Sequence, residues 1–150
     1  MKKPVNEMKL AFPSRSSNES FARVAVASFV AQLDPTVEEI CEIKTAVSEA
    51  VTNCIVHAYR NTVGKIEVTA KFDEDGVVTI KIRDKGCGIP DIGQAMQPMF
   101  TTCAEEERAG LGFAVMESFT DKLRVTSRVG KGTAVTMTKR LQLRVRGNEG

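Results

Sequence analysis

The residues best suited to chemistry lie in one stretch, Glu49-Ala-Val-Thr-Asn53-Cys-Ile-Val-His57. Glu49, Asn53 and His57 are spaced i, i+4 and i+8. Each step of four residues in a helix turns by only about 40°, so the three side chains share one side. The neighbouring face is apolar, and a carboxylate and an amide beside it are costly unless something polar lies opposite them. The stretch indicates either a ligand site or a solvated polar edge with Asn53 bonded to a nearby loop.

Two helices are predicted around this stretch. Ser16-Ser-Asn-Glu19 and Thr36-Val-Glu-Glu39 both match the capping box, in which a hydroxyl and a carboxylate satisfy amides at the start of a helix. Apolar residues at helical spacing follow each box. The pattern predicts one helix over residues 18–33 and a second from Thr36 to about Tyr59, separated by Asp34-Pro35.

Several segments alternate apolar and polar residues, as strands do. They span residues 8–12, 66–72, 78–84, 123–127 and 133–139. Pro13 closes the first, which predicts an edge strand that could pair with a second copy of the chain.

Asp84 is a second candidate for chemistry. It continues the core-facing parity of Val78, Ile80 and Ile82 and is followed by Gly86-Cys-Gly88. An inward carboxylate next to glycines, which let the backbone approach a ligand closely, suggests a binding pocket. The alternative is that Asp84 only forms a turn with Gly86.

The region from residue 91 to residue 109 loses any period, and a loop of this length is usually functional, often a lid. Gly110-Leu-Gly112 is expected to open a third helix, whose first amides would make an anion site. These elements predict an α+β two-layer sandwich with a mixed or antiparallel sheet and three helices on one face. Residues 1–150 would form a single domain with a basic tail from about residue 140.

Composition excludes several classes of protein. The net charge is +2, and Lys and Arg alternate with Asp and Glu through most of the chain, so no direct nucleic-acid partner is expected. The cysteines, Cys41, Cys54, Cys87 and Cys103, form no C-x-x-C pair, which favours a reduced cytoplasmic protein. No apolar run is long enough to span a membrane.

The order of the motifs is more specific than any one of them. Glu49-x-x-x-Asn53, Asp84-x-Gly-x-Gly88, a lid-like loop, Gly110-x-Gly112 and Gly132-Thr133 follow one another. This order resembles the GHKL, or Bergerat, nucleotide-binding fold of gyrases, chaperones and histidine kinases.

Further segments resemble the anti-sigma-F family of sporulation serine kinases. They are Leu33-Asp-Pro-Thr36, Ile43 to Asn53, Gly88-Ile-Pro-Asp91, Pro98-Met-Phe-Thr-Thr102 and Arg108-Ala-Gly-Leu-Gly-Phe113. This resemblance implies binding of ATP or ADP with Mg²⁺ and phosphorylation of a serine on a small anti-anti-sigma factor. It also implies a homodimer that sequesters a sigma-F-type sigma factor.

The resemblance assigns roles to the candidate residues. Glu49 would be the general base for the serine hydroxyl, and Asn53 would coordinate Mg²⁺, which prefers hard oxygen ligands. Asp84 would accept a hydrogen bond from the adenine amino group. The remaining positions of the nucleotide site would be Gly86, Gly88 and Thr133 around the base, and Arg108, Gly110 and Gly112 at the phosphates.

Three assignments keep an alternative. His57 follows Asn53 by one helical step and could contribute to the nucleotide site, or act only as a structural hydrogen-bonding group. Glu19 and Arg23 match positions at which the family meets its sigma factor, but exposed charges are commonly just solvated. Arg108 could act on phosphate or balance Glu105 to Glu107.

Three other functions remain open at this point. One is a switch kinase for a stress-response sigma factor, with the same chemistry and another partner. A second is a detached histidine-kinase catalytic domain, which would need a second protein because the only histidine here is His57. A third is a binding module whose nucleotide gates docking without turnover, although such a module has no use for a base at Glu49.

Overall fold

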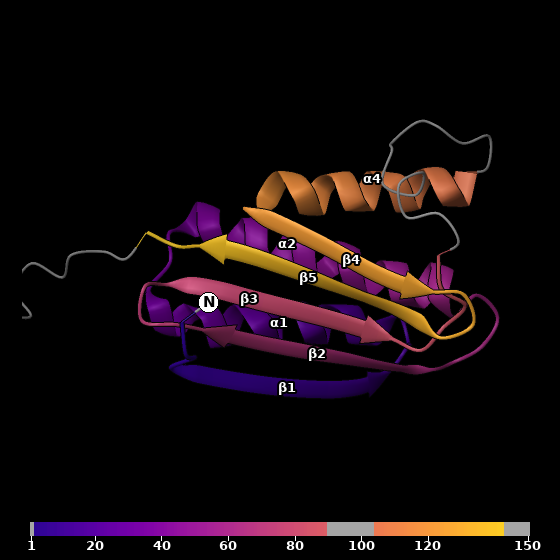
Figure 1. The fold of residues 1–150 in the computed structure, drawn as a ribbon, viewed down its shortest axis with the longest axis horizontal. Coiled ribbons are helices and arrows are strands. Elements are labelled where there is room, and N and C mark those ends of the chain that lie inside the picture. The colour runs from indigo at the N-terminus through magenta and orange to yellow at the C-terminus, as the bar shows by residue number, and fades with distance from the viewer. Residues whose placement is uncertain (1, 90–103, 143–150) are drawn as a thin grey trace, which may run out of the picture.

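Alternating strands build one antiparallel sheet, in the order β1-β2-β3-β5-β4 (Figure 1). The computed structural model describes residues 2–89 and 104–142, with the backbone alone over 104–110. The strands are β1 (Asn6–Pro13), β2 (Lys65–Phe72), β3 (Val77–Asp84), β4 (Lys122–Arg128) and β5 (Gly132–Arg140). The predicted strands are confirmed, and β1 is an edge strand as Pro13 indicates.

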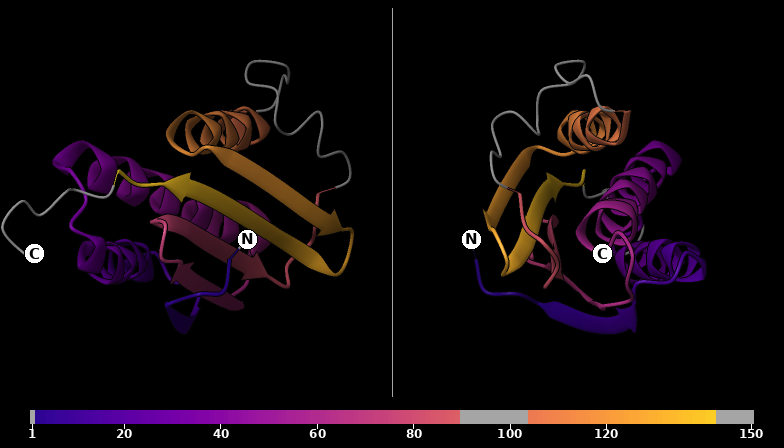
Figure 2. Two further views of the ribbon diagram at one scale, coloured as in Figure 1. Left: turned by 60° about the vertical axis from the view of Figure 1, so that its left-hand side comes forward. Right: turned by 90° about the vertical axis from the view of Figure 1, so that its right-hand side faces the viewer.

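Helices cover one face of this sheet (Figure 2). They are α1 (Ser17–Val30), the 3₁₀ turn η1 (Ala31–Leu33), α2 (Val37–Asn53), the π-helical η2 (Cys54–Ala58) and α4 (Ala104–Phe119). The helix α4 packs mainly on α2, beside the edge of the sheet that β4 forms. The predicted α+β sandwich is confirmed. Among the described residues, no helix is long and apolar enough to cross a membrane.

The core lies between the sheet and the pair α1 and α2. The helix α2 buries one apolar stripe, and the inward residues of the strands meet it. Fully buried members include Val26, Val30, Ile43, Val47, Val51, Ile66, Val68, Ile82, Met116 and Met137. Each such aliphatic side chain contributes roughly 1.5–3 kcal/mol of transfer free energy. The stripe of α2 therefore fixes which of its sides remains free for polar residues.

The two predicted capping boxes have different outcomes. At Thr36 the box is present: its Oγ accepts from Glu39 N–H at 3.0 Å, and Glu39 Oε1 accepts from Thr36 N–H at 2.8 Å. At Ser16 the prediction is wrong, because Ser16 is itself helical and its side chain makes no cap bond. The carboxylate of Glu19 is turned toward Ser48 of α2 instead. A contact between helices has replaced the local cap.

The third helix starts earlier than predicted. It begins at Ala104, so the segment up to Ala109 is not loop, and Gly110 and Gly112 lie inside the helix rather than opening it. The alanines and glutamates of this segment are good helix formers, and acidic residues favour a helix N-terminus. The rest of the predicted lid, residues 91–103, and the predicted tail beyond residue 142 lie outside the described residues.

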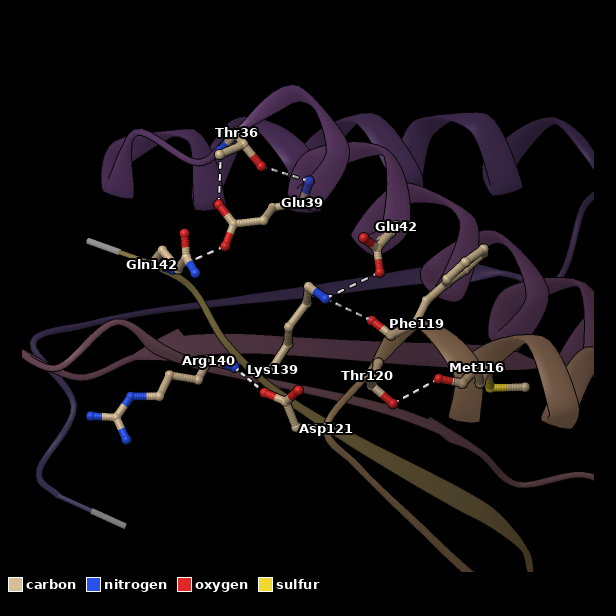
Figure 3. Close-up of polar contacts among 10 residues, drawn as sticks. All are labelled: Thr36, Glu39, Glu42, Met116, Phe119, Thr120, Asp121, Lys139, Arg140 and Gln142. Atoms are coloured by element: carbon tan, nitrogen blue, oxygen red, sulfur yellow. Dashed lines mark hydrogen bonds and ion pairs between the residues drawn. The ribbon is translucent and has the colours of Figure 1, made fainter. Parts of the chain in front are cut away.

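A half-buried cation, Lys139, connects α2, the end of α4 and β5 (Figure 3). Lys139 has the inward parity of β5, and only 14% of its side chain is exposed. Its Nζ donates to Glu42 Oε2 of α2 at 3.3 Å and to the carbonyl of Phe119 at 3.0 Å. A positive charge at the last carbonyls of α4 also suits the helix dipole. Lys139 therefore anchors the C-terminal end of α4 to α2 and β5.

Replacing Lys139 by Met is expected to lower the free energy of unfolding by about 1–2 kcal/mol, because Glu42 and the Phe119 carbonyl lose a partner in a poorly hydrated place. Urea denaturation measures the change. The matched control is Lys9→Met, an exposed lysine of β1, for which a change within about 0.5 kcal/mol is expected. Equal losses in the two variants would show that the tie does not stabilise the fold.

Candidate functional site

The polar edge of α2 ends where the helix changes its hydrogen-bonding pattern. Asn53 is the last residue of α2, and the π-helical η2 follows at once. Single π-helical turns inside helices often mark functional sites. Asn53 Nδ2 is buried and has no hydrogen-bond partner within the described part of the chain. A buried amide without a partner is costly, which points to a ligand that supplies one.

Gly112 of α4 faces this edge. A Cβ atom built on Gly112 would lie 3.1 Å from Glu49 Oε2 and 3.3 Å from Asn53 Oδ1. The absence of a side chain lets α4 approach the carboxylate and the amide closely. The structure thus brings together Glu49, Asn53 and Gly112, three residues predicted for the site.

His57 was predicted to share one side of a regular helix with Glu49 and Asn53. It lies within η2 instead, where the π-helical turn changes the angular step between residues. Its carbonyl accepts from Cys87 Sγ at 3.4 Å. His57 therefore helps to hold the turn that follows β3 against the end of the α2 segment.

Asp84 is buried at the end of β3, as the alternation predicts, with 5% of its surface exposed. Its Oδ1 accepts from Gly86 N–H at 2.9 Å and from Thr133 N–H at 3.2 Å. Its Oδ2 accepts from Cys54 Sγ at 3.5 Å. Burial raises the pKa of Asp84, and these three donors only partly oppose the shift. One carboxylate thus joins β3, β5, η2 and the glycine turn.

The glycines after Asp84 are required by close backbone approaches. A Cβ on Gly86 would lie 2.4 Å from the carbonyl of Ala58. Gly88 has φ +78°, and a Cβ there would lie 2.2 Å from the carbonyl of Arg128. The turn from Asp84 to Gly88, here called the Asp84 turn, therefore fits between η2 and the β4–β5 hairpin only when Gly86 and Gly88 carry no side chain.

Thr133 lies beside this turn and is 8% exposed. Its Oγ1 is 2.8 Å from Ser127 Oγ, which also accepts from Ile89 N–H at 2.8 Å. Thr133, Asp84 and Gly88 are thus gathered at one end of the sheet, as expected for a shared pocket.

Three residues of this region were missed by the sequence analysis. Cys54 was assigned to the apolar face but contacts Asp84, and burial together with that carboxylate raises the pKa of its thiol. Tyr59 donates to the carbonyl of Lys65 and accepts from the N–H of Lys85, both at 2.7 Å. Ser127 supports Thr133. Only the polar type of Tyr59 and Ser127 could have drawn attention to them, because each also bonds to a backbone N–H that is distant in sequence, that of Lys85 and that of Ile89 respectively.

The remaining predicted residues lie elsewhere. Glu19 accepts from Ser48 Oγ and pairs with Arg23 Nε at 3.5 Å, so these two charges are bound to each other beside α2 rather than freely solvated. Arg108 and Gly110 belong to the N-terminal half of α4, where only the backbone is described.

The comparisons with known proteins all indicate the same family for this chain. The histidine kinase-like ATPase domain family matches residues 12–139. An anti-sigma F factor of Caldanaerobacter subterraneus subsp. tengcongensis is 62% identical over 134 residues, which is 89% of this chain and 93% of that protein. One from Geobacillus kaustophilus is 57% identical over 136 residues, or 91% and 93% of the two chains.

This chain belongs to the anti-sigma F factor family. It has the fold of histidine kinase-like ATPase domains. The crystal structure of the RsbU and RsbW domains of Rv1364c from Mycobacterium tuberculosis shows the same fold, with a TM-score of 0.68 at 23% identity. That match covers 92% of this chain and 33% of the mycobacterial chain.

The pH dependence of stability, compared between the wild type and Asp84→Asn, tests whether the Asp84 carboxylate is buried. In the folded chain the pKa of Asp84 is raised above its ordinary value of 3.8. Ionising this carboxyl group as the pH rises therefore lowers the free energy of unfolding. The stability of the wild type relative to Asp84→Asn should therefore be smaller at about pH 7 than at about pH 3.5. Urea denaturation of both proteins at the two pH values measures this difference. A difference that is constant, or that grows toward neutral pH, would contradict the assignment.

Proposed function

We propose that this chain is an ATP-dependent protein serine kinase that also binds a sigma-F-type sigma factor. The observation that carries the proposal is the meeting of Glu49 and Asn53 with Gly112. There a carboxylate, and an amide whose Nδ2 has no partner among the described residues, face a helix that has no side chain at that point. Membership of the anti-sigma F family and the ATPase fold support the proposal.

Adenine would bind at the Asp84 end of the site. The exocyclic amino group of adenine is a donor, and within the described part of the chain Asp84 Oδ2 accepts only from a weak thiol donor at 3.5 Å. Gly86, Gly88 and Thr133 would border the base, because the same turn brings all three to Asp84 or its neighbours. The buried carboxylate would then select adenine by hydrogen bonding rather than by charge.

Asn53 would hold Mg²⁺ together with the phosphates. The amide offers a hard oxygen, and magnesium commonly takes one or two protein ligands plus phosphate oxygens. Among the described residues, no cluster of three or more His, Cys, Asp or Glu could hold a metal alone, so a shared site of this kind fits the chain. When bound, the ion would offset negative charge on the phosphates.

Glu49 would act as the general base. It would accept the proton of the incoming serine hydroxyl while the serine oxygen forms a bond to the γ-phosphorus and the bond to the bridging oxygen of ADP breaks. Gly112 would leave room for the transferring group beside Glu49, and the charge of Arg108 would stabilise that group, whereas the amides of Gly110 and Gly112 lie inside α4 and are used within the helix. His57 would contribute by fixing the turn near the base.

Membership of the anti-sigma F family supports a proposal for the protein partners. The substrate would be a serine of a small anti-anti-sigma factor, and the inhibited protein a sigma-F-type sigma factor. Glu19 and Arg23 would lie in the sigma-binding surface of α1, a helix that also exposes the apolar side chains of Phe21 and Val24. The unpaired edge of β1 would be available to a second copy of the chain, and the complex would act in the cytoplasm.

Glu49→Gln is expected to lower transfer of labelled γ-phosphate from ATP to the anti-anti-sigma factor by at least about 100-fold, because general bases contribute about 10²–10⁴. Nucleotide affinity should stay within a few-fold, since the amide keeps the shape of the side chain. Glu38→Gln, an exposed change in the first turn of the same helix, is the control. Loss of nucleotide binding in Glu49→Gln would make Glu49 structural, and full activity would exclude it as the base.

Gly112→Ala is expected to weaken ATP binding without lowering the stability of the fold. Alanine favours a helix by roughly 1 kcal/mol over glycine, so thermal stability should not fall. The new Cβ would crowd Glu49 and Asn53, and ATP affinity measured by calorimetry should drop about tenfold or more, a cost of about 1.4 kcal/mol. Glu117→Ala on the exposed part of α4 should leave affinity unchanged. Normal affinity in Gly112→Ala would show that the phosphates lie elsewhere.

A further inference from the structure

The face of the sheet away from the helices is strongly basic. In the part of the chain that the structure describes, no helix covers this face (Figure 2). Strand parity directs every second residue onto it. The basic residues at its outward strand positions are Lys9, Lys65, Lys71, Lys81, Arg83, Lys122, Arg124, Arg128 and Arg140, and the acidic ones are Glu7 and Glu67. We call this surface the basic sheet face.

One row crosses the whole of the basic sheet face. The register pairs Lys9 with Thr69, Thr69 with Lys81, Lys81 with Thr136, and Thr136 with Arg124. Cations therefore alternate with hydroxyls, and successive cations lie about 10 Å apart, two strand spacings. Lys81 and Arg124 are both exposed, and neither forms an ion pair within the described residues.

The two layers carry opposite charge. The whole chain is nearly neutral, with 21 Lys and Arg against 19 Asp and Glu. The helices α1 and α2 hold Glu19, Glu38, Glu39, Glu42 and Glu49 against Arg23 and Lys44. On the sheet face, by contrast, Glu67 is surrounded by Lys65, Arg83 and Lys85, which lower its pKa. Positive and negative charges alternate along the sequence, which predicts no nucleic-acid partner, but folding places most of the positive charges of the strands on one face of the sheet.

The chemistry of the basic sheet face favours phosphates over a protein. Protein interfaces usually centre on aromatic or large apolar residues and are poor in Lys. The outward strand positions hold no aromatic residue or methionine, and Val77 is their one large aliphatic side chain. Without aromatic rings the face also lacks the stacking platforms that bind single strands. Lys, Arg and Thr together are the groups that contact phosphate oxygens.

We propose that the basic sheet face binds the phosphate backbone of double-stranded nucleic acid without reading its sequence. The surface lies on the opposite side of the sheet from α1 and α2, so the proposal is independent of the kinase site. Binding there would raise the local concentration of this chain near DNA, where a transcription factor acts.

The test uses the full chain and a fluorescently labelled 20-base-pair duplex of arbitrary sequence, followed by anisotropy. A dissociation constant in the micromolar range is expected at about 50 mM salt, with affinity falling at least tenfold by about 200 mM. The double variant Lys81→Glu/Arg124→Glu should bind at least tenfold more weakly than the wild type, with an unchanged melting temperature and unchanged phosphate transfer.

The matched control is Arg15→Glu/Lys44→Glu, which changes the net charge equally but lies outside the basic sheet face. This control variant should retain most of its affinity for the duplex, because both substituted residues lie outside the basic sheet face. An equal loss in the control would overturn the proposal in favour of a net-charge effect. Absence of binding by the wild type at 50 mM salt, or equal affinity for polyglutamate, which would indicate an acidic protein partner, would also overturn it.

Discussion

The arrangement of this molecule depends on one buried carboxylate. Asp84 accepts hydrogen bonds from the backbone amide of Gly86 and from that of Thr133, which is 49 residues away from Asp84 in the chain, and also from the thiol of Cys54. An ionised group is expensive to bury unless donors surround it, so the turn after β3, the start of β5 and the η2 segment have to meet at this point. The nucleotide site proposed here occupies the space around that meeting point.

The parts predicted from sequence are those with a local physical cause. The stripe of α2 and the alternation in the strands are fixed by burial, and the Thr36 box is fixed by groups within one turn. These were enough to place Glu49 beside Asn53 and to turn Asp84 inward. The order of the motifs then indicated the family, which the comparisons confirm.

The parts that sequence did not predict depend on distant partners. Ser16 has the same local pattern as Thr36, yet Glu19 bonds to Ser48 on another helix instead of closing a cap. The π-helical turn after Asn53 and the early start of α4 leave no clear periodic signal. The basic sheet face is also invisible along the chain, because strand parity assigns alternating charges to different layers.

We propose that α2, Gly112 and the turn from Asp84 to Gly88 form one nucleotide site. A crystal structure of the chain with Mg²⁺ and a non-hydrolysable ATP analogue tests it most directly. We expect the adenine amino group at Asp84, the metal at Asn53, and the γ-phosphate between Glu49 and Gly112. A nucleotide bound elsewhere, or one whose phosphates do not reach Asn53, would contradict the account.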